Sequence, residues 1–369
     1  MTTATAMAKP HSHGPNEEGG HASRADRPVS FDLEAIPVPR GREEDWRFTP
    51  IRRIDRLFDP ASYAEGDAPV TVEAPEGVIV EKAGRDDERL GTVLAPGDRT
   101  AVVAWNTFTE STIITIPKES VLAEPIRLNV DAIEGTRPQH IRIEVGELAE
   151  ATIILSHRGS PEAALNQTIE LNAADASKLT FVSIQEWDDT SLHASNHRLA
   201  LGKDTKLTGG ELTMLGLYFV DGGQHLEHRV FVDHSQPNCY SRVTYKGALQ
   251  GEDAHSVWIG DCLIRETADG TDTYELNRNL VLTEGAKADS VPNLEIENGE
   301  IAGAGHASAT GRFDDEQLFY LMSRGISEMD ARRLVVRGFF AELINQIGVP
   351  EVIDHLMESV EAELAKNRN

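Results

Sequence analysis

A chain of 369 residues is long enough for two or three domains and a sizeable core. Its 61 acidic and 35 basic residues give a net charge of -26, which repels nucleic acid and anionic membrane surfaces at long range. The two cysteines, Cys239 and Cys262, are too few for a disulfide framework, and their spacing matches no zinc motif. Because of the strongly negative charge, we expect neither nucleic acid nor a membrane as a partner.

No segment indicates export or membrane insertion. The first residues contain no apolar stretch typical of a secretory signal, and no run approaches the roughly 18 to 20 apolar residues that span a bilayer. The scarcity of cysteine suits a reducing compartment. A cytoplasmic location is the resulting expectation.

Residues 1–27 are rich in Ala, His, Gly, Pro and Ser and lack periodicity, which predicts a disordered tail. Residues 28–100 form a less regular N-terminal region that opens with proline-rich turns. This region holds the most basic stretch of the chain, whose arginines either pair with surplus carboxylates or form a docking face for an acidic partner. The arginines are Arg40, Arg42, Arg47, Arg52, Arg53 and Arg56.

Residues 101–312 are composed of short strand-like runs separated by Gly, Asn and Asp. Several runs alternate, as Ile141, Ile143 and Val145 do, which places one face inside. Many short strands at near-even spacing fit a sandwich, a barrel or a β-solenoid, and no repeat of fixed length chooses among them. The predicted strands include 102–105, 111–116, 140–145, 151–155, 178–184, 229–232, 242–245 and 256–259.

The remainder of the chain, residues 313–369, has helical periodicity. Asp314 can begin a first helix with a capping box, and Gly325 fits the position just after its end. Ser327 begins a second helix and Pro350 a third. The amphipathic helices can pack on one another, cap the end of the β core, or bind a partner.

Nucleotide-binding motifs are missing from the sequence. No G-x-x-x-x-G-K-[ST] loop is present, so ATP binding by this chain is not expected. Gly303 and Gly305 begin a dinucleotide-like pattern, but Ser308 occupies the third glycine position, outside any strand–turn–helix context. A dinucleotide fold is therefore excluded.

A series of three histidines lies near the middle of the chain. Within a strand, His225 and His228 would point to opposite faces and could not easily share a metal, whereas His228 and His234 would share a face. We interpret all three as turn or surface histidines. Cys239 and Cys262 are interpreted as small buried hydrophobes, since a persulfide or cluster ligand needs an exposed thiolate of low pKa.

His306 lies in the run G-A-G-H-A-S-A-T-G. The small neighbours leave its imidazole accessible, and neutral imidazole is a good ligand for iron. Composition alone favours a structural histidine at this place.

Three segments resemble the SufB/SufD family of iron–sulfur cluster assembly scaffolds. The run E-D-W-R-F-T at residues 44–49 resembles a signature near the start of SufD-type members. Residues 278–296 resemble the core signature of the family, and residues 305–327 resemble the histidine-plus-helix signature that follows it. Their order and spacing are specific, and together they cover about a fifth of the chain.

Two departures from the SufB pattern resemble SufD-type members. Asn277 stands where SufB-type proteins carry an essential cysteine, and Ala307 follows His306 where they have a glutamate. Many SufD-type members also have a cysteine two positions before the histidine, where this chain has Ala304. The resemblance therefore leaves His306 as the single ligand candidate there.

The resemblance implies a mainly β protein with a right-handed parallel β-helix core, a less regular N-terminal region and a C-terminal helical domain. It implies a non-enzymatic scaffold that pairs with SufB through the β-helix, with a homodimer as an alternative pairing. The ATPase SufC would dock on the C-terminal helices, including Phe339, Phe340 and Leu343. An iron–sulfur cluster would form transiently at the SufB interface with His306 as a cluster or iron ligand, and the isolated chain would hold no cofactor stably.

Two other functions stay open. A stand-alone β-solenoid enzyme acting on a sugar polymer would need paired carboxylates, for which Asp188, Asp189 and Asp233 are candidates. A purely structural adaptor would bind an ATPase through its helices, and His306 would be inert.

Overall fold

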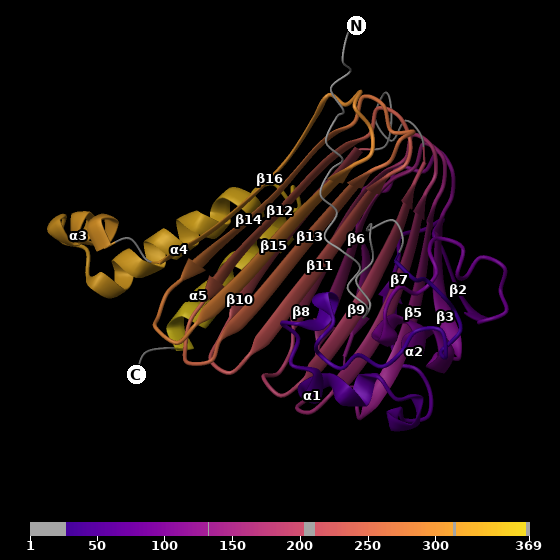
Figure 1. The fold of residues 1–369 in the computed structure, drawn as a ribbon, viewed down its shortest axis with the longest axis horizontal. Coiled ribbons are helices and arrows are strands. Elements are labelled where there is room, and N and C mark those ends of the chain that lie inside the picture. The colour runs from indigo at the N-terminus through magenta and orange to yellow at the C-terminus, as the bar shows by residue number, and fades with distance from the viewer. Residues whose placement is uncertain (1–26, 132, 203–210, 313–314, 367–369) are drawn as a thin grey trace, which may run out of the picture.

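The computed structural model describes residues 27–131, 133–202, 211–312 and 315–366 (Figure 1). The predicted disordered tail, apart from Arg27, lies outside the described residues, as does the capping residue Asp314. Strands dominate the described chain and stack in parallel ladders, with helices at the C-terminus. The predicted parallel β-helix fold is therefore confirmed.

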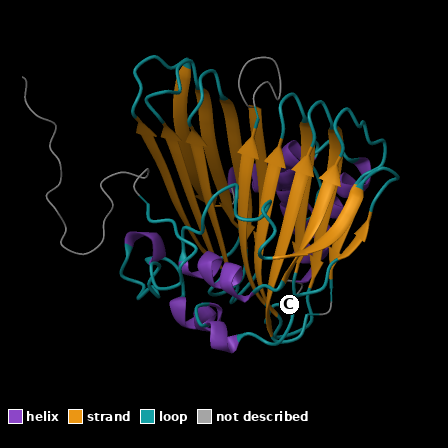
Figure 2. Cartoon of the chain, turned by 90° about the vertical axis from the view of Figure 1, so that its right-hand side faces the viewer, coloured by secondary structure: helices purple, strands orange, loops and turns teal. Residues whose placement is uncertain are grey.

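The first half of the solenoid consists of two facing sheets. One sheet has the order β1 (Thr71–Glu73), β4 (Ile126–Val130), β6 (Glu150–Arg158) and β8 (Lys178–Glu186). The other has the order β2 (Ile79–Gly84), β3 (Glu110–Ile116), β5 (Thr136–Val145), β7 (Ala164–Ala173) and β9 (Leu192–Leu201). Figure 2 shows the two walls of strands facing one another across the interior.

The second half repeats this plan. One sheet has the order β10 (Glu211–Val220), β12 (Tyr240–Leu249), β14 (Asp272–Val281) and β16 (Gly303–Arg312). The facing sheet has the order β11 (His225–His234), β13 (His255–Ile264) and β15 (Lys287–Ile296). Consecutive strands alternate between the two walls, so each coil of the solenoid contains one strand from each.

The length of a coil explains why no fixed repeat is visible in the sequence. In the first half, Thr136 pairs with Ala164 and Ala164 with Leu192, a spacing of 28 residues. In the second half, Glu211 pairs with Tyr240 and Tyr240 with Asp272, spacings of 29 and 32 residues. The repeat therefore varies in length along the chain, and periodicity alone could not reveal it.

Both halves of the solenoid bury apolar and polar side chains. The first half has a large aliphatic core with residues such as Ile114 and Leu128, and it also contains the buried pair His157 and Gln167. In the second half the buried side chains include Trp258 and Asn277. A packed aliphatic interior serves stability, whereas buried polar groups need hydrogen-bond partners or another role.

The two halves of the solenoid are joined mainly by side-chain contacts on its outer faces. Among the described residues, no backbone ladder connects β8 to β10 or β9 to β11. Arg56 donates to the Glu162 carbonyl in the first half at 3.2 Å, and Arg53 donates to the Gly223 carbonyl in the second half at 2.9 Å. On the opposite wall α5 (Pro350–Lys366) contacts both halves, since Val352 packs in one cluster with Ile184 and other α5 residues pack against Ala248.

The N-terminal region contributes short helices. These are η2 (Glu44–Trp46), α1 (Ile51–Ile54), η3 (Asp55–Leu57), η4 (Pro60–Ser62) and α2 (Arg99–Thr107). α2 lies against the wall that contains β5, β7 and β9. Residues 102–105 lie within α2, so the strand predicted there was wrong. The Asp98 side chain accepts a hydrogen bond from the backbone of Ala101 and caps this helix, and its apolar face is buried at Val102 and Val103.

The C-terminal helices are α3 (Asp315–Ser323), α4 (Glu328–Ile344) and α5. The predicted helix boundaries at Gly325, Ser327 and Pro350 are confirmed, because Gly325 has φ 85°, Ser327 caps α4, and Pro350 is the first residue of α5. α4 and α5 pack on the outer face of the wall that contains β10, β12 and β14. Figure 1 shows α3 projecting beyond the strands from the far end of α4.

Candidate functional site

One end of the solenoid is open. β16 pairs only with β14, and β15 pairs only with β13, so each of these last strands has one free edge among the described residues. His306 lies on β16 and is exposed. Its in-register neighbour on β14 is Glu275, which is buried in the interior. Since in-register neighbours in a parallel ladder point to the same face, His306 is directed to the interior side of the open end.

Glu275 is a feature that the sequence analysis missed. Its side chain is only 1% exposed, and neither carboxylate oxygen has a hydrogen-bond partner among the described residues. Burial raises the pKa of Glu275 to about 8, and the charge of Asp261 contributes in the same direction. The residue is 31 positions away from His306 in the chain, so only knowledge of the strand register could have brought the two together.

A polar network lies beside this pair and includes Asn277, which is fully buried. The Asn277 amide donates to the Tyr218 hydroxyl at 3.0 Å and accepts from the Asn279 amide at 2.8 Å. Asn279 in turn donates to the Thr310 hydroxyl of β16 at 3.3 Å. Asn277 is therefore committed to structural hydrogen bonds and leaves no free group for sulfur chemistry.

The two cysteines differ in environment. Cys262 is 2% exposed in the interior, with Sγ 3.5 Å from the Thr273 hydroxyl, and burial raises its pKa to about 12. Its thiol is neutral and unreactive at physiological pH, as predicted. Cys239 is half-buried in a turn, where its thiol donates to the Gln236 carbonyl at 3.2 Å, so the interpretation as a small buried hydrophobe was wrong for Cys239.

The histidine series lies on β11 with the predicted alternation. His225 is on the outer face, while His228 and His234 point inward, and the His234 imidazole is 3.0 Å from the Ser241 hydroxyl. The interpretation as turn or surface histidines was therefore wrong for His228 and His234. His225 instead faces His255 of the next coil, with their Nδ1 atoms 3.1 Å apart, a contact that the sequence could not show.

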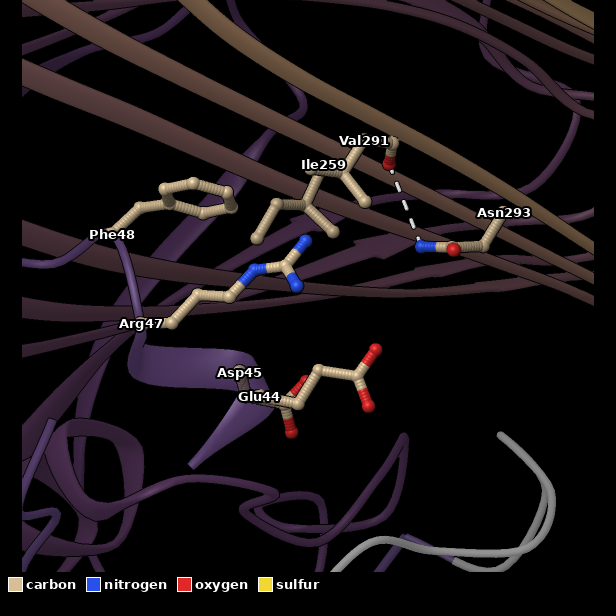
Figure 3. Close-up of a pocket in the computed structure, with 7 residues that line it drawn as sticks. All are labelled: Glu44, Asp45, Arg47, Phe48, Ile259, Val291 and Asn293. Atoms are coloured by element: carbon tan, nitrogen blue, oxygen red, sulfur yellow. Dashed lines mark hydrogen bonds between the residues drawn. The ribbon is translucent and has the colours of Figure 1, made fainter. Parts of the chain in front are cut away.

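The signature at residues 44–49 lies across the outer face of β11, β13 and β15. The Thr49 hydroxyl donates to Glu227 at 2.8 Å, and the Arg229 guanidinium lies 4.9 Å from the Trp46 ring. A shallow hollow with a volume of about 10 Å³ lies between this segment and the sheet. In Figure 3, Arg47 and Phe48 approach Ile259 and Val291 of the sheet. The hollow has room for about one water molecule, so it is no substrate cleft.

The carboxylates proposed for glycoside hydrolysis are engaged separately. Asp233 forms a bidentate pair with Arg265, both contacts at 2.8 Å. Hydrogen bonds from Thr190 lower the pKa of Asp188, which is opposite to the change that a catalytic acid needs. Asp189 accepts a hydrogen bond at 2.7 Å from a side chain in the β10–β11 turn. These contacts do not favour a pair of catalytic carboxylates.

The C-terminal residues singled out for partner docking are buried or partly buried within this chain. Phe340 and Leu343 are buried, and Phe339 is partly buried beside Phe340. Lys246 of β12, itself 2% exposed, donates to the Phe339 carbonyl at 3.0 Å and to the Glu342 carboxylate at 2.5 Å. Because Phe339, Phe340 and Leu343 are buried or partly buried, direct contact of these side chains with a partner is not favoured.

The chain is similar to proteins of iron–sulfur cluster assembly. A scan of protein families matches the SufBD core domain of the SUF system for FeS cluster assembly over residues 128–214 and 206–339. A SufBD family protein of Mycobacterium tuberculosis is 49% identical over 366 residues, covering 91% of this chain and 92% of the relative. A relative in Mycobacterium leprae is 48% identical, covering 91% and 93%. The protein named SufD in Escherichia coli is 28% identical, covering 83% and 84%.

The protein is a parallel β-solenoid with an open end and a C-terminal helical domain. The family and the relatives match the chain over most of its length, and together these findings define the class of protein. The chain belongs to the SufBD family of iron–sulfur cluster assembly proteins. Among the helices that the structure describes, none is long and apolar enough to span a membrane.

Proposed function

We propose that this chain is the SufD-type subunit of a complex with SufB and SufC, and that it serves as a scaffold without enzymatic activity of its own. The extended similarity to the protein named SufD supports this branch of the family. The hydrogen-bonded amide of Asn277 supports it as well, because a side chain committed in this way cannot accept sulfur as a cysteine can. The nascent cluster is cargo that the complex holds transiently.

The position of His306 carries this proposal. Its imidazole stands on the last strand of the solenoid, exposed, and on the interior side of the open end. The free edges of β15 and β16 offer backbone N–H and C=O groups to a second solenoid. SufB docks on these edges in our proposal, and the cluster forms between His306 and ligands that SufB supplies. A homodimer would use the same edges.

The C-terminal helices are the proposed docking site for SufC, the subunit that hydrolyses ATP. Several large apolar side chains of α3 and of the first half of α4 are exposed, and an ATPase can cover them. They are Phe319, Tyr320, Met322, Met329 and Leu334. Phe339 and Phe340 contribute indirectly, because they belong to the cluster that packs α4 on the sheet, and Leu343 is buried.

A cytoplasmic location is part of the same proposal. Cys239 and Cys262 are not joined to each other, and both thiols are free. Free thiols and oxygen-sensitive iron–sulfur chemistry both suit a reducing compartment.

The experiment is co-expression of the chain with its proposed partners, followed by purification through a tag on this chain and assay of iron and sulfide. We expect SufB and SufC to co-purify. We expect His306→Ala to keep the complex and lose most of the bound iron and sulfide. In cells that lack the wild-type chain, normal cluster formation by His306→Ala would contradict the proposed role of the histidine.

A structural adaptor is the second candidate, because the contacts of α4 and α5 described above serve packing rather than chemistry. It predicts that SufC co-purifies and that His306→Ala changes nothing. A stand-alone enzyme predicts turnover of a sugar polymer by the purified chain without any partner.

A further inference from the structure

The interior side of the open end carries a second group suited to bind metal. Glu275 of β14 is the ladder neighbour of His306 on β16. Adjacent strands lie about 4.8 Å apart, so the two side chains start from neighbouring positions on one face. A carboxylate oxygen and an imidazole nitrogen each bind iron at about 2 Å, and side chains that start this close can reach the same ion.

The carboxylate of Glu275 has no other role among the described residues. The neighbouring amides of Asn277 and Asn279 have hydrogen-bond partners, whereas both oxygens of Glu275 have none. A buried carboxyl group without hydrogen-bond partners is costly, and buried carboxylates are normally paired or coordinate a metal. An ion that enters from the open end would supply the missing partner.

The opposite wall of the solenoid leaves space for this carboxylate. Gly260 of β13 faces it, and a Cβ atom at Gly260 would lie 2.7 Å from Glu275 Oε2 and 2.2 Å from the Trp258 ring. Both distances are too short for an ordinary contact. Glycine at this place therefore allows Glu275 and Trp258 to be accommodated together.

We propose that Glu275 and His306 form a ligand pair for the ferrous ion that enters the assembly site, with the carboxylate on the interior side and the imidazole at the rim. The proposal rests on the proposed function, because it gives His306 a partner within its own chain. Among the described residues, no three His, Cys, Asp or Glu side chains converge on one point. The site is thus incomplete in one chain, and a docked subunit and sulfide supply the remaining ligands.

The test is anaerobic titration of the purified full-length chain with ferrous ion alone, by calorimetry. We expect saturable binding of one ion, weakened at least about tenfold by Glu275→Gln and by His306→Ala. In the double variant the two losses should not add, because both residues bind the same ion. The matched control is Glu297→Gln, which removes one carboxylate from an exposed turn at the same end of the solenoid and should leave binding unchanged.

Two outcomes separate this proposal from the proposed function. If His306→Ala abolishes cluster assembly in the complex while Glu275→Gln leaves both ferrous binding and assembly intact, Glu275 is not a ligand and the role of His306 stands. If neither variant alters assembly, the proposed function itself fails. Glu275→Asp keeps the charge on a shorter side chain, and its partial loss of binding together with native circular dichroism would show that ligation rather than folding is affected. The absence of saturable ferrous binding by the wild-type chain would overturn the ligand pair.

Discussion

The carboxyl group of Glu275 should make the stability of the protein fall as the pH rises. Burial raises its pKa in the folded state from 4.5 to about 8. Between these values the folded state holds a proton that the unfolded state has released. The stabilising effect of that proton is fully present below pH 4.5 and is lost progressively as the pH approaches 8.

The magnitude follows from the two pKa values. Their difference is about 3.5, and each pKa unit corresponds to about 1.4 kcal/mol, so the full loss is roughly 5 kcal/mol. At pH 7.5 the loss is about 4 kcal/mol. Glu275→Gln removes the ionisable group and keeps a similar shape. We therefore expect the variant to match the wild type near pH 4.5 and to exceed its free energy of unfolding by about 4 kcal/mol at pH 7.5.

The assay is urea unfolding of both proteins at a series of pH values, followed by the fluorescence of tryptophan, of which Trp258 is buried near Glu275. The comparison between the two proteins cancels the titration of groups that do not interact with Glu275. Glu297→Gln serves as control, since its exposed carboxylate has little effect on stability. If the free energies of Glu275→Gln and wild type stay parallel from pH 4.5 to 8, the reasoning about the buried carboxylate is refuted.

Two further predictions concern the structural ion pairs. Glu170 is fully buried and lies 3.3 Å from the Arg142 guanidinium and 3.7 Å from that of Arg198. Glu170→Ala should therefore lower the free energy of unfolding, measured by thermal unfolding, by about 3–5 kcal/mol. Glu150→Ala, which breaks an exposed pair, should lower it by about 1 kcal/mol or less. An equal loss in both variants would contradict this account. Lys246→Met removes the hydrogen bonds to α4 and should cost about 2 kcal/mol, with faster hydrogen exchange in α4 and α5 but not in the strands of the first half. Unchanged exchange in α4 would show that apolar packing alone holds the helix.

Much of the local secondary structure could be predicted from the sequence. Alternation at Ile141 and Ile143 predicted strands correctly, and Gly325, Ser327 and Pro350 marked the C-terminal helices because each acts on the backbone of its own turn. The error at residues 102–105 has a local cause. A run of Ala and Val suits a strand as well as a helix, and the capping contact from Asp98 decides between them.

The candidate site was only half predictable. His306 was visible through its small neighbours and through the family resemblance. Glu275 was not, because it reaches His306 only through the register of a coil whose length varies along the solenoid. The same limit applies to His225 and His255, which are 30 residues apart and in contact. Contacts between coils depend on cumulative turn lengths, and no local pattern records those.

The two ends of the solenoid differ in how their strands are paired. At the first end, β1 and β2 run antiparallel to their neighbours and interrupt the parallel ladder, and β2 carries the charged residues Glu81 and Lys82. A rod with two compatible ends would polymerise head to tail into a filament. Among the described residues, only the end with β15 and β16 continues the parallel ladder, so in the assembly that we propose, docking through this end would close after two solenoids. A complex built in this way would have a finite stoichiometry.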